Sequence, residues 1–297
     1  MKIEKELTTC QDFNNMVVQY YAEVIKLLEK HHIKTHLGFQ GHPEGTISYL
    51  LVMNYLEIVR RTTEVKTQSD KVFTGSDVGK MRQYFNGLFE SEIDYSKALI
   101  DMGCGGPDWK DTYWTKLPKV IGLELNYLRL LEARKVFPDE KKVELVFSPT
   151  GMTDFPDNSI PQVLSSAIIT SVTPNIAQLH LRECWRILEP KGKLIIARVQ
   201  TKSLKNIIKG GTFTEFNGVY GAFNQVLSKK EFCSLVDKCC PNNKWVKFKK
   251  MGFRLPLIPA QIKHDMYDWK YFKYLDAFIN AVIPHMAIHF LAVIEKQ

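Results

Sequence analysis

The stretch Lys97-Ala-Leu-Ile-Asp-Met-Gly-Cys-Gly-Gly-Pro107 decides the fold of this chain. Its apolar run, Ala98 to Ile100, predicts a buried parallel strand, and the glycines that follow predict a turn whose backbone can approach a ligand closely. An acidic residue, Glu124, follows Asp101 by 23 positions, just after a second apolar run at Val120 to Leu123. This is the layout of a nucleoside site, with glycines ending the first strand and a carboxylate for the ribose hydroxyls ending the second.

The rest of the chain divides into two parts. From Ala98 onward short apolar runs alternate with helical stretches, which predicts a parallel sheet covered by helices on both faces. The first ninety or so residues show only helical spacing, so we expect an N-terminal helical cap over residues 1–92 and a core over 93–297, with substrate-facing insertions around 205–227 and 252–284. Expected strands are 98–102, 119–123, 143–147, 162–166, 192–198, 244–249 and 286–295. Expected helices are 16–28 (capped by Asn14 or Asn15), 48–60, 76–88, 126–136, 174–187, 204–209, 228–238 and 266–282.

The glycine turn differs from the G-x-G-x-x-G of NAD enzymes, because no third glycine follows at the required spacing. Its form, Asp101-x-Gly103-x-Gly105, resembles motif I of the class I S-adenosylmethionine-dependent methyltransferases. The resemblance implies that these three residues hold the amino-acid end of S-adenosylmethionine, and that Glu124 binds its ribose with Leu125 beside it. It also implies a Rossmann-like fold of class α/β, with a seven-stranded sheet whose last strand is antiparallel.

The segment Ser148 to Pro161 resembles the family's third motif in its second half, but departs from it at the start. Pro149 stands where family members usually place an aspartate that receives the adenine amino group. A proline offers neither a side-chain acceptor nor an amide hydrogen. We therefore expect adenine to depend on backbone groups around Thr150, Gly151 and Met152, or on water.

The acceptor side is less clearly marked. Tyr20 and Tyr21, followed by Thr35-His-Leu-Gly-Phe39, loosely resemble the Y-Y-D … H-x-G-Y-W pattern of family members that methylate small molecules. On this basis Tyr21 and His36 are candidate catalytic residues and Tyr20 a candidate substrate contact. The alternatives are core packing for both tyrosines and a packed, hydrogen-bonded position for His36.

A segment rich in glycines and aromatic residues, Lys209 to Asn224, follows the fifth strand and suits a substrate-facing loop. Tyr220 is a third catalytic candidate, and Glu215 and Asn217 are candidate substrate contacts. Ordinary loop packing is the alternative for all three.

The formal charge of +8 fits either solvated lysine-rich faces or an anionic substrate. No RNA-binding appendage is recognisable, so nucleic acid is not expected. No Asp/His cluster has metal-ligand spacing, so no metal is expected. Six cysteines without a C-x-x-C pair indicate reduced thiols, and Met1 to Leu7 is charged where a signal peptide is apolar, so we expect a cytoplasmic protein. The longest apolar run, Phe278 to Ile294, is interrupted by polar residues and a proline, and is too short to predict a membrane span.

These features together predict an enzyme that moves the methyl group of S-adenosylmethionine to a carbon, oxygen or nitrogen of a small molecule, by in-line displacement in a lidded pocket. An RNA or protein methyltransferase is one alternative. A non-catalytic, ligand-binding member of the same fold is another, which Pro149 leaves open. The sequence does not indicate the oligomeric state.

Overall fold

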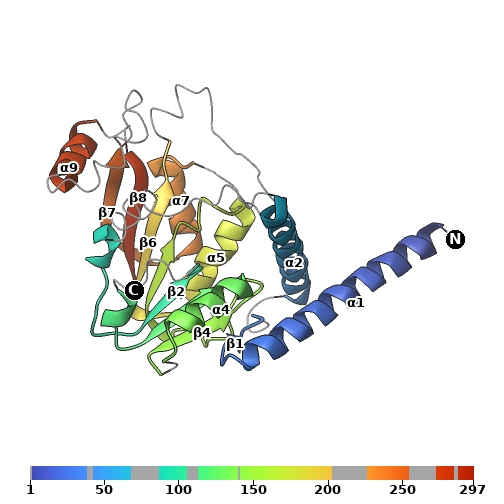
Figure 1. Cartoon of the computed structure of the whole chain (residues 1–297). Helices are drawn as coiled ribbons and strands as arrows, with labels where there is room; N and C mark the ends of the chain where they lie inside the picture. Colours follow the sequence, from blue (N-terminus) through green and yellow to red (C-terminus); the bar gives the residue numbers. More distant parts are fainter. Residues whose placement is uncertain are drawn as a thin grey trace.

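The computed structural model of this chain describes residues 2–38, 43–67, 87–105, 113–139, 141–202, 226–253, 272–283 and 287–297. At its centre is an 8-stranded sheet in the order β1-β4-β3-β2-β5-β6-β8-β7 (Figure 1). The strands are β1 (Lys34–Thr35), β2 (Leu99–Met102), β3 (Val120–Glu124), β4 (Val143–Phe147), β5 (Ile160–Ser166), β6 (Leu188–Gln200), β7 (Asn243–Phe253) and β8 (Ala287–Lys296).

The pairing of the strands confirms the predicted fold class. From β1 across to β6 all neighbours are parallel, and β8 lies antiparallel between β6 and β7. The expected number of seven strands was wrong, because β1 lies inside the stretch predicted to precede any strand. Lys34 and Thr35 pair with Val146 and Phe147, at the carboxyl end of β4. A strand of two residues is too short to leave a period in the sequence.

The described helices are α1 (Lys2–Glu29), α2 (Glu44–Thr67), α4 (Tyr127–Val136), α5 (Pro174–Ile187), α7 (Lys229–Cys239) and α9 (Phe272–Val282). The expected start of the first helix near Met16 was wrong, and so was its cap at Asn14 or Asn15, since α1 already begins at Lys2. Its first residues are mostly charged or polar, so an apolar period becomes visible only later in the helix. The expected helix at 204–209 and most of that at 76–88 lie outside the described residues.

Side-chain caps fix the starts of the helices that follow the strands. Asn126 accepts a hydrogen bond from the backbone N–H of Leu128 at the start of α4, and Thr173 plays the same part before Pro174 in α5. Ser228 and Glu231 form a capping box at the start of α7. These local signals explain why the starts of α4, α5 and α7 fall at or within one residue of their predicted positions.

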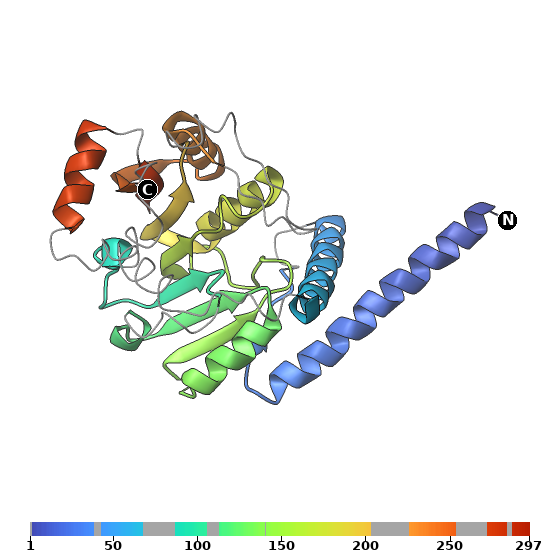
Figure 2. The same cartoon turned by 45° about the horizontal axis from the view of Figure 1, so that its top comes forward.

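Helices cover both faces of the sheet (Figure 2). Ile100 and Met102 pack into a core shared with Leu181 of α5, and Leu99 packs into the opposite core with Leu130 of α4. The amino-terminal half of α1 projects away from the body of the molecule (Figures 1 and 2). None of the helices in the described ranges is long and apolar enough to cross a membrane.

Candidate functional site

The glycine turn after β2 requires glycine for two separate reasons. Gly103 and Gly105 have φ angles of 72° and 67°, a left-handed backbone that costs other residues strain. In addition, a Cβ on Gly103 would lie 2.4 Å from Cδ1 of Ile168, in the loop after β5. The turn therefore presents bare backbone at the carboxyl end of β2, as the sequence predicts.

Glu124, the last residue of β3, ties this turn to the start of α4. Its Oε2 accepts a hydrogen bond from the N–H of Gly105 at 2.6 Å, and its Oε1 accepts from the N–H groups of Leu125 and Asn126, each at 3.0 Å. A carboxylate has about four lone-pair sites, so three N–H donors leave capacity for one further donor. That capacity, on Oε2, is enough for one ribose hydroxyl. A second hydroxyl would have to share the lone pair of Oε2 that accepts from the Gly105 N–H.

Asp101 is fully buried and braces the segment that follows the glycine turn. Its Oδ2 accepts hydrogen bonds from the Tyr113 hydroxyl at 2.8 Å and from Trp114 Nε1 at 3.2 Å. Burial and the nearby Asp101 carboxylate raise the pKa of Tyr113 well above its usual value, so the phenol stays protonated and remains a donor. The sequence prediction missed both aromatic residues, although a Tyr-Trp pair soon after a glycine turn was a usable signal.

The loop after β4 uses its polar groups on the chain itself. The hydroxyl of Thr150 donates to the carbonyl of Leu37 at 3.2 Å and accepts from the N–H of Met152 at 3.1 Å. The Ser148 hydroxyl donates to the carbonyl of Met152 at 2.5 Å. The side chain of Thr150 and the N–H of Met152, both predicted adenine contacts, therefore already have partners within the protein.

Gly151 and Leu125 are brought together next to Glu124, the predicted ribose carboxylate. Gly151 has a φ of 73°, and a Cβ built on it would lie 3.9 Å from Cδ2 of Leu125. Leu125 directly follows Glu124 in the sequence. Gly151, a predicted adenine contact, thus lies next to Leu125, the residue that follows the carboxylate predicted to bind ribose.

The segment after β1 is fastened to the same loop by Asp154. Its carboxylate accepts hydrogen bonds from the N–H groups of Leu37 at 3.1 Å and Gly38 at 2.9 Å. Gly38 has a φ of 74°, and a Cβ there would lie 2.2 Å from the Cβ of Met152. We call Leu37, Gly38, Thr150, Met152 and Asp154 the latch.

His36 lies next to the latch. Its Nδ1 accepts a hydrogen bond from the N–H of Asp154 at 3.2 Å, and its ring meets that of Phe155 edge-on at 4.6 Å. Burial lowers the pKa of His36, so the ring is held neutral with its proton on Nε2. β1 is three strands from β2, roughly 14 Å at the usual strand spacing. These contacts favour the packed alternative for His36 over that of a general base.

Tyr20 and Tyr21 lie in the contact between α1 and α2. The hydroxyl of Tyr21 donates to Oδ1 of Asn54 at 2.7 Å, and Nδ2 of Asn54 donates to the carbonyl of Leu125 at 3.2 Å. Tyr20 packs edge-on against Tyr21 and Tyr55, and burial raises its pKa. A chain of hydrogen bonds therefore runs from α1 through α2 to the end of β3. The sequence prediction missed Asn54, whose only signal was a polar residue within an amphipathic helix.

Glu183 of α5 holds the far end of the loop after β4. It is fully buried, and its Oε1 accepts hydrogen bonds from the N–H and the hydroxyl of Thr153 and from Arg186. Arg186 also donates to the carbonyl of Phe155 at 2.8 Å and to Asp157 at 2.6 Å. The loop is thus fixed from both sides, by the latch and by α5.

The remaining predictions can be placed briefly. Glu215, Asn217 and Tyr220 lie outside the described residues. Among the residues that the structure describes, no group of three or more His, Cys, Asp or Glu side chains is placed to hold a metal ion.

Comparison with known proteins gives a family match for part of the core. Residues 100–196, from β2 into β6, match a sequence profile described as a methyltransferase domain. A search of curated proteins gave no match to this sequence. Among solved structures, a Burkholderia thailandensis 1,6-didemethyltoxoflavin-N1-methyltransferase with bound S-adenosylhomocysteine is 12% identical, with 86% of this chain and 91% of that chain covered and a TM-score of 0.52.

A second solved structure, an S-adenosylmethionine-dependent methyltransferase from Archaeoglobus fulgidus, is 14% identical. It covers 80% of this chain and 99% of its own, with a TM-score of 0.50. At these identities the two structures establish a shared fold. The predicted resemblance is thus confirmed by the sequence profile together with the fold.

Proposed function

We propose that this chain acts as a class I S-adenosylmethionine-dependent methyltransferase on a small molecule held beneath the N-terminal helices. One observation carries the proposal: Asn54 of α2 donates at 3.2 Å to the carbonyl of Leu125, the residue after the ribose carboxylate. The helical cap is therefore hydrogen-bonded to the edge of the sheet where the cofactor binds. A cap in that position suits a lidded pocket, which fits a small acceptor better than a polymer.

The described residues fit the cofactor. The backbone at Gly103 and Gly105 takes its amino-acid end, Glu124 accepts a ribose hydroxyl, and Leu125 and Gly151 flank adenine. When bound, S-adenosylmethionine supplies a methyl group on a sulfonium, which an acceptor atom can displace in line. What remains for the protein is to hold the acceptor about 3 Å from the methyl group and to exclude water.

Catalysis in this proposal depends mainly on positioning. Tyr21 and His36 act as positioning residues, because the Tyr21 hydroxyl is bonded to Asn54 and the His36 ring to the backbone of Asp154. Tyr220 stays a sequence prediction for a residue that contacts the acceptor. Tyr20, Glu215 and Asn217 stay predictions for substrate contacts.

Calorimetry with S-adenosylhomocysteine tests the cofactor site. We expect one molecule bound per chain, and a stabilisation of about 2.7 kcal/mol when the ligand is at about 100 times its dissociation constant. Neither heat nor a shift in unfolding with this ligand or with S-adenosylmethionine would contradict the assignment of the site.

Turnover assays then test the acceptor class. The enzyme is supplied with S-adenosylmethionine and, separately, small amines, acids and phenols, total RNA, or unfolded protein, and release of S-adenosylhomocysteine is measured. The proposal expects release with a small molecule only. Release with RNA, together with an affinity for RNA that falls steeply as salt rises, would replace it with the macromolecular alternative.

A further inference from the structure

Helix α9 has polar residues on its buried side and apolar residues on its exposed side. Asp276 and Asn280, one turn apart, are only 4% and 9% exposed. The exposed positions that the structure describes in this helix are all apolar and recur every three or four residues, which places them on one face: Tyr274, Ala277, Phe278, Ala281 and Val282. A helix on the surface of a globular protein normally has the reverse arrangement.

Hydrogen bonds hold α9 in this orientation. Oδ2 of Asp276 accepts from the N–H of Gly252, near the end of β7, at 3.1 Å. Nδ2 of Asn280 donates to Oδ1 of Asp276 at 2.8 Å and to its carbonyl at 2.9 Å. Rotating the helix to bury its apolar side would break the bond to Gly252. The fold itself therefore turns the apolar face outward.

This apolar face lies at the outer end of the sheet, beyond β7 (Figures 1 and 2). β7 is four strands from β2, about 19 Å at the usual strand spacing, so the face is no part of the cofactor site at the glycine turn. Tyr274, Phe278 and Val282 are 63%, 65% and 61% exposed, and Ile283 after the helix is 45% exposed. Contiguous exposed apolar side chains of this kind mark a surface that interacts with something else.

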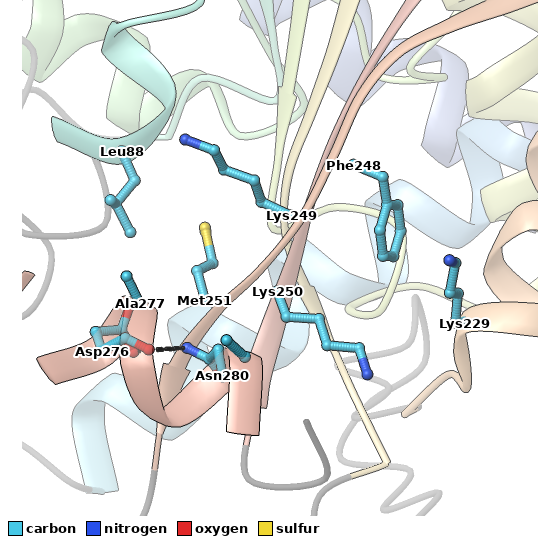
Figure 3. Close-up of a pocket in the computed structure, with 10 residues that line it drawn as sticks. Leu88, Lys229, Phe248, Lys249, Lys250, Met251, Asp276, Ala277 and Asn280 are labelled. Atoms are coloured by element: carbon cyan, nitrogen blue, oxygen red, sulfur yellow. Dashed lines mark hydrogen bonds between the residues drawn. The ribbon is translucent and has the colours of Figure 1, made fainter. Parts of the chain in front are cut away.

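Basic side chains flank the same face. Lys249 and Lys250 extend from β7 and Lys229 from the start of α7, and they line a cavity along one side of α9 together with Ala277 and Ala281 (Figure 3). Lys229 and Lys249 are exposed. The only carboxylate of α9 lies on its buried side, and the whole chain carries a formal charge of +8. An apolar strip and positive charge are thus presented side by side.

The size and the charge of this surface favour one occupant. α9 has 11 residues, so its exposed face is about 16 Å long and about 10 Å wide, whereas a stable protein interface covers about 800 Å² on each partner. A symmetric contact with a second copy would also bring the same lysines toward one another. A lipid surface needs no matching shape, and anionic headgroups attract lysines beside the helix.

We propose that α9 docks this chain on the surface of a membrane that contains anionic lipids. Tyr274, Phe278 and Val282 insert among the lipids, to the depth of about 5–10 Å that is usual for such a helix. Lys229 and Lys249 lie at the level of the headgroups. The docking depends neither on the cofactor nor on the identity of the methyl acceptor.

Co-sedimentation of the full chain with lipid vesicles tests the docking. The vesicles are made of phosphatidylcholine alone or with about 30% phosphatidylserine. We expect the protein to bind the anionic vesicles about ten-fold or more tightly than the neutral ones, and to be released as salt rises from about 0.1 M to about 0.5 M. No binding to the anionic vesicles, or equal binding to both kinds, would overturn the proposal.

Variants locate the docking surface. Phe278→Gln should weaken binding to the anionic vesicles about ten-fold. The matched control is Val136→Gln on α4, which replaces a 51% exposed side chain of a helix that contacts β3 and β4 and should bind normally. Equal binding by Phe278→Gln and the native chain would overturn the proposal.

A second pair of variants tests the charges. Lys229→Gln combined with Lys249→Gln should weaken vesicle binding about ten-fold. Lys135→Gln combined with Lys141→Gln changes the net charge equally, at two exposed positions in and after α4, and should weaken it much less. Equal losses in the two double variants would mean that net charge alone attracts the protein, which would overturn the assignment to α9.

Two further measurements on Phe278→Gln test the other occupants of the face. A native dimer that this variant dissociates, seen by sedimentation velocity without vesicles, would assign the face to a second copy. A large loss of stability in urea with unchanged vesicle binding would assign it to another part of the chain. Either result overturns the proposal. Affinity for S-adenosylhomocysteine, measured by calorimetry, should be the same in every variant, which separates failure of the docking from failure of the cofactor site.

Discussion

The glycine turn with Glu124 and the loop after β4 lie at the same edge of the sheet, yet they are built differently. At the turn, backbone with positive φ at Gly103 and Gly105 faces a carboxylate that keeps some hydrogen-bonding capacity. In the loop, Thr150 and Asp154 direct their polar groups at Leu37 and Gly38 of the N-terminal segment. The turn thus suits the ligand we propose for it, whereas the loop binds the N-terminal segment of the chain.

This difference gives Pro149 a physical context. The loop has Pro149 in place of the side chain that usually receives adenine. The hydroxyl of Thr150 and the N–H of Met152 are used in hydrogen bonds within the latch. If the comparison is right, variants of the turn should reduce cofactor affinity, and variants of the latch should reduce stability of the cap with little effect on the cofactor.

The largest effect is expected for Gly103→Ala. The alanine must adopt a φ of 72° and place its Cβ 2.4 Å from Ile168 Cδ1, which together should cost about 2–4 kcal/mol of folding free energy. Urea unfolding measures that loss, and calorimetry with S-adenosylhomocysteine should show weakened binding as well.

Two further variants separate strain from crowding. Gly105→Ala has a similar φ, but its Cβ would meet only Arg129 Nη1 at 3.4 Å, so it should lose less stability. Adding Ile168→Val, which removes the crowding methyl group, should restore part of the loss in Gly103→Ala. Full stability of Gly103→Ala alone would show that the turn does not need glycine there.

Glu124→Gln should come next. The substitution sets an amide NH₂ against backbone N–H groups that now donate to a carboxylate. Loss of a charge-assisted acceptor is worth about 1.5–3 kcal/mol, so affinity for S-adenosylhomocysteine should fall roughly ten- to hundred-fold. The matched control is Glu144→Gln. Native Glu144 on β4 forms ion pairs with Lys34 and Lys119, away from the glycine turn, so this variant should bind the ligand normally. Unchanged affinity in Glu124→Gln would remove the ribose assignment.

Asp154→Ala tests the other side of the comparison. Removing the acceptor for the Leu37 and Gly38 N–H groups should cost about 1–3 kcal/mol and speed hydrogen exchange at those two amides. Affinity for S-adenosylhomocysteine should change less than three-fold. A large loss of affinity with unchanged exchange would mean that the loop serves the ligand, and the distinction between the two regions would fail.

The sequence predicted the turn well because its signals are local. Gly103, Gly105 and Glu124 are marked by residue type and by their positions after two apolar strands, and strand ends determine where such residues meet. The helix starts at Asn126 and Thr173 were likewise set by adjacent residues. Such features need no knowledge of contacts between distant parts of the chain.

The latch could not be predicted for the opposite reason. Asp154 and Gly38 are separated by 116 positions in the sequence, and nothing near either residue indicates that the two are in contact. β1 has only two residues, and its pairing with β4 is what makes Leu37 and Gly38 reach the loop. The roles first suggested for Tyr21 and His36 depended on a loose match to a family pattern. Their hydrogen bonds are made with partners far away in the sequence, Asn54 and Asp154.

The smallest effect, the pH response of His36, tests the latch once more. Its pKa is lowered from 6.5 by burial, so the unfolded chain binds more protons than the folded one just below pH 6.5. The contribution of the neutral ring is therefore complete above pH 6.5 and is lost as pH falls toward the folded pKa. Protonation of Nδ1 would also remove the acceptor for the Asp154 N–H.

His36→Asn keeps an acceptor for that N–H but does not titrate. As the pH is lowered from 7.5 to 5, the free energy of unfolding of this variant should therefore rise relative to that of the native chain. Urea unfolding at both values measures the change. His180, buried and with its pKa lowered to about 4, contributes a loss of the same sign to both proteins and cancels in the difference. A difference independent of pH would mean that the His36 ring is not held neutral, and that the latch does not depend on its charge state.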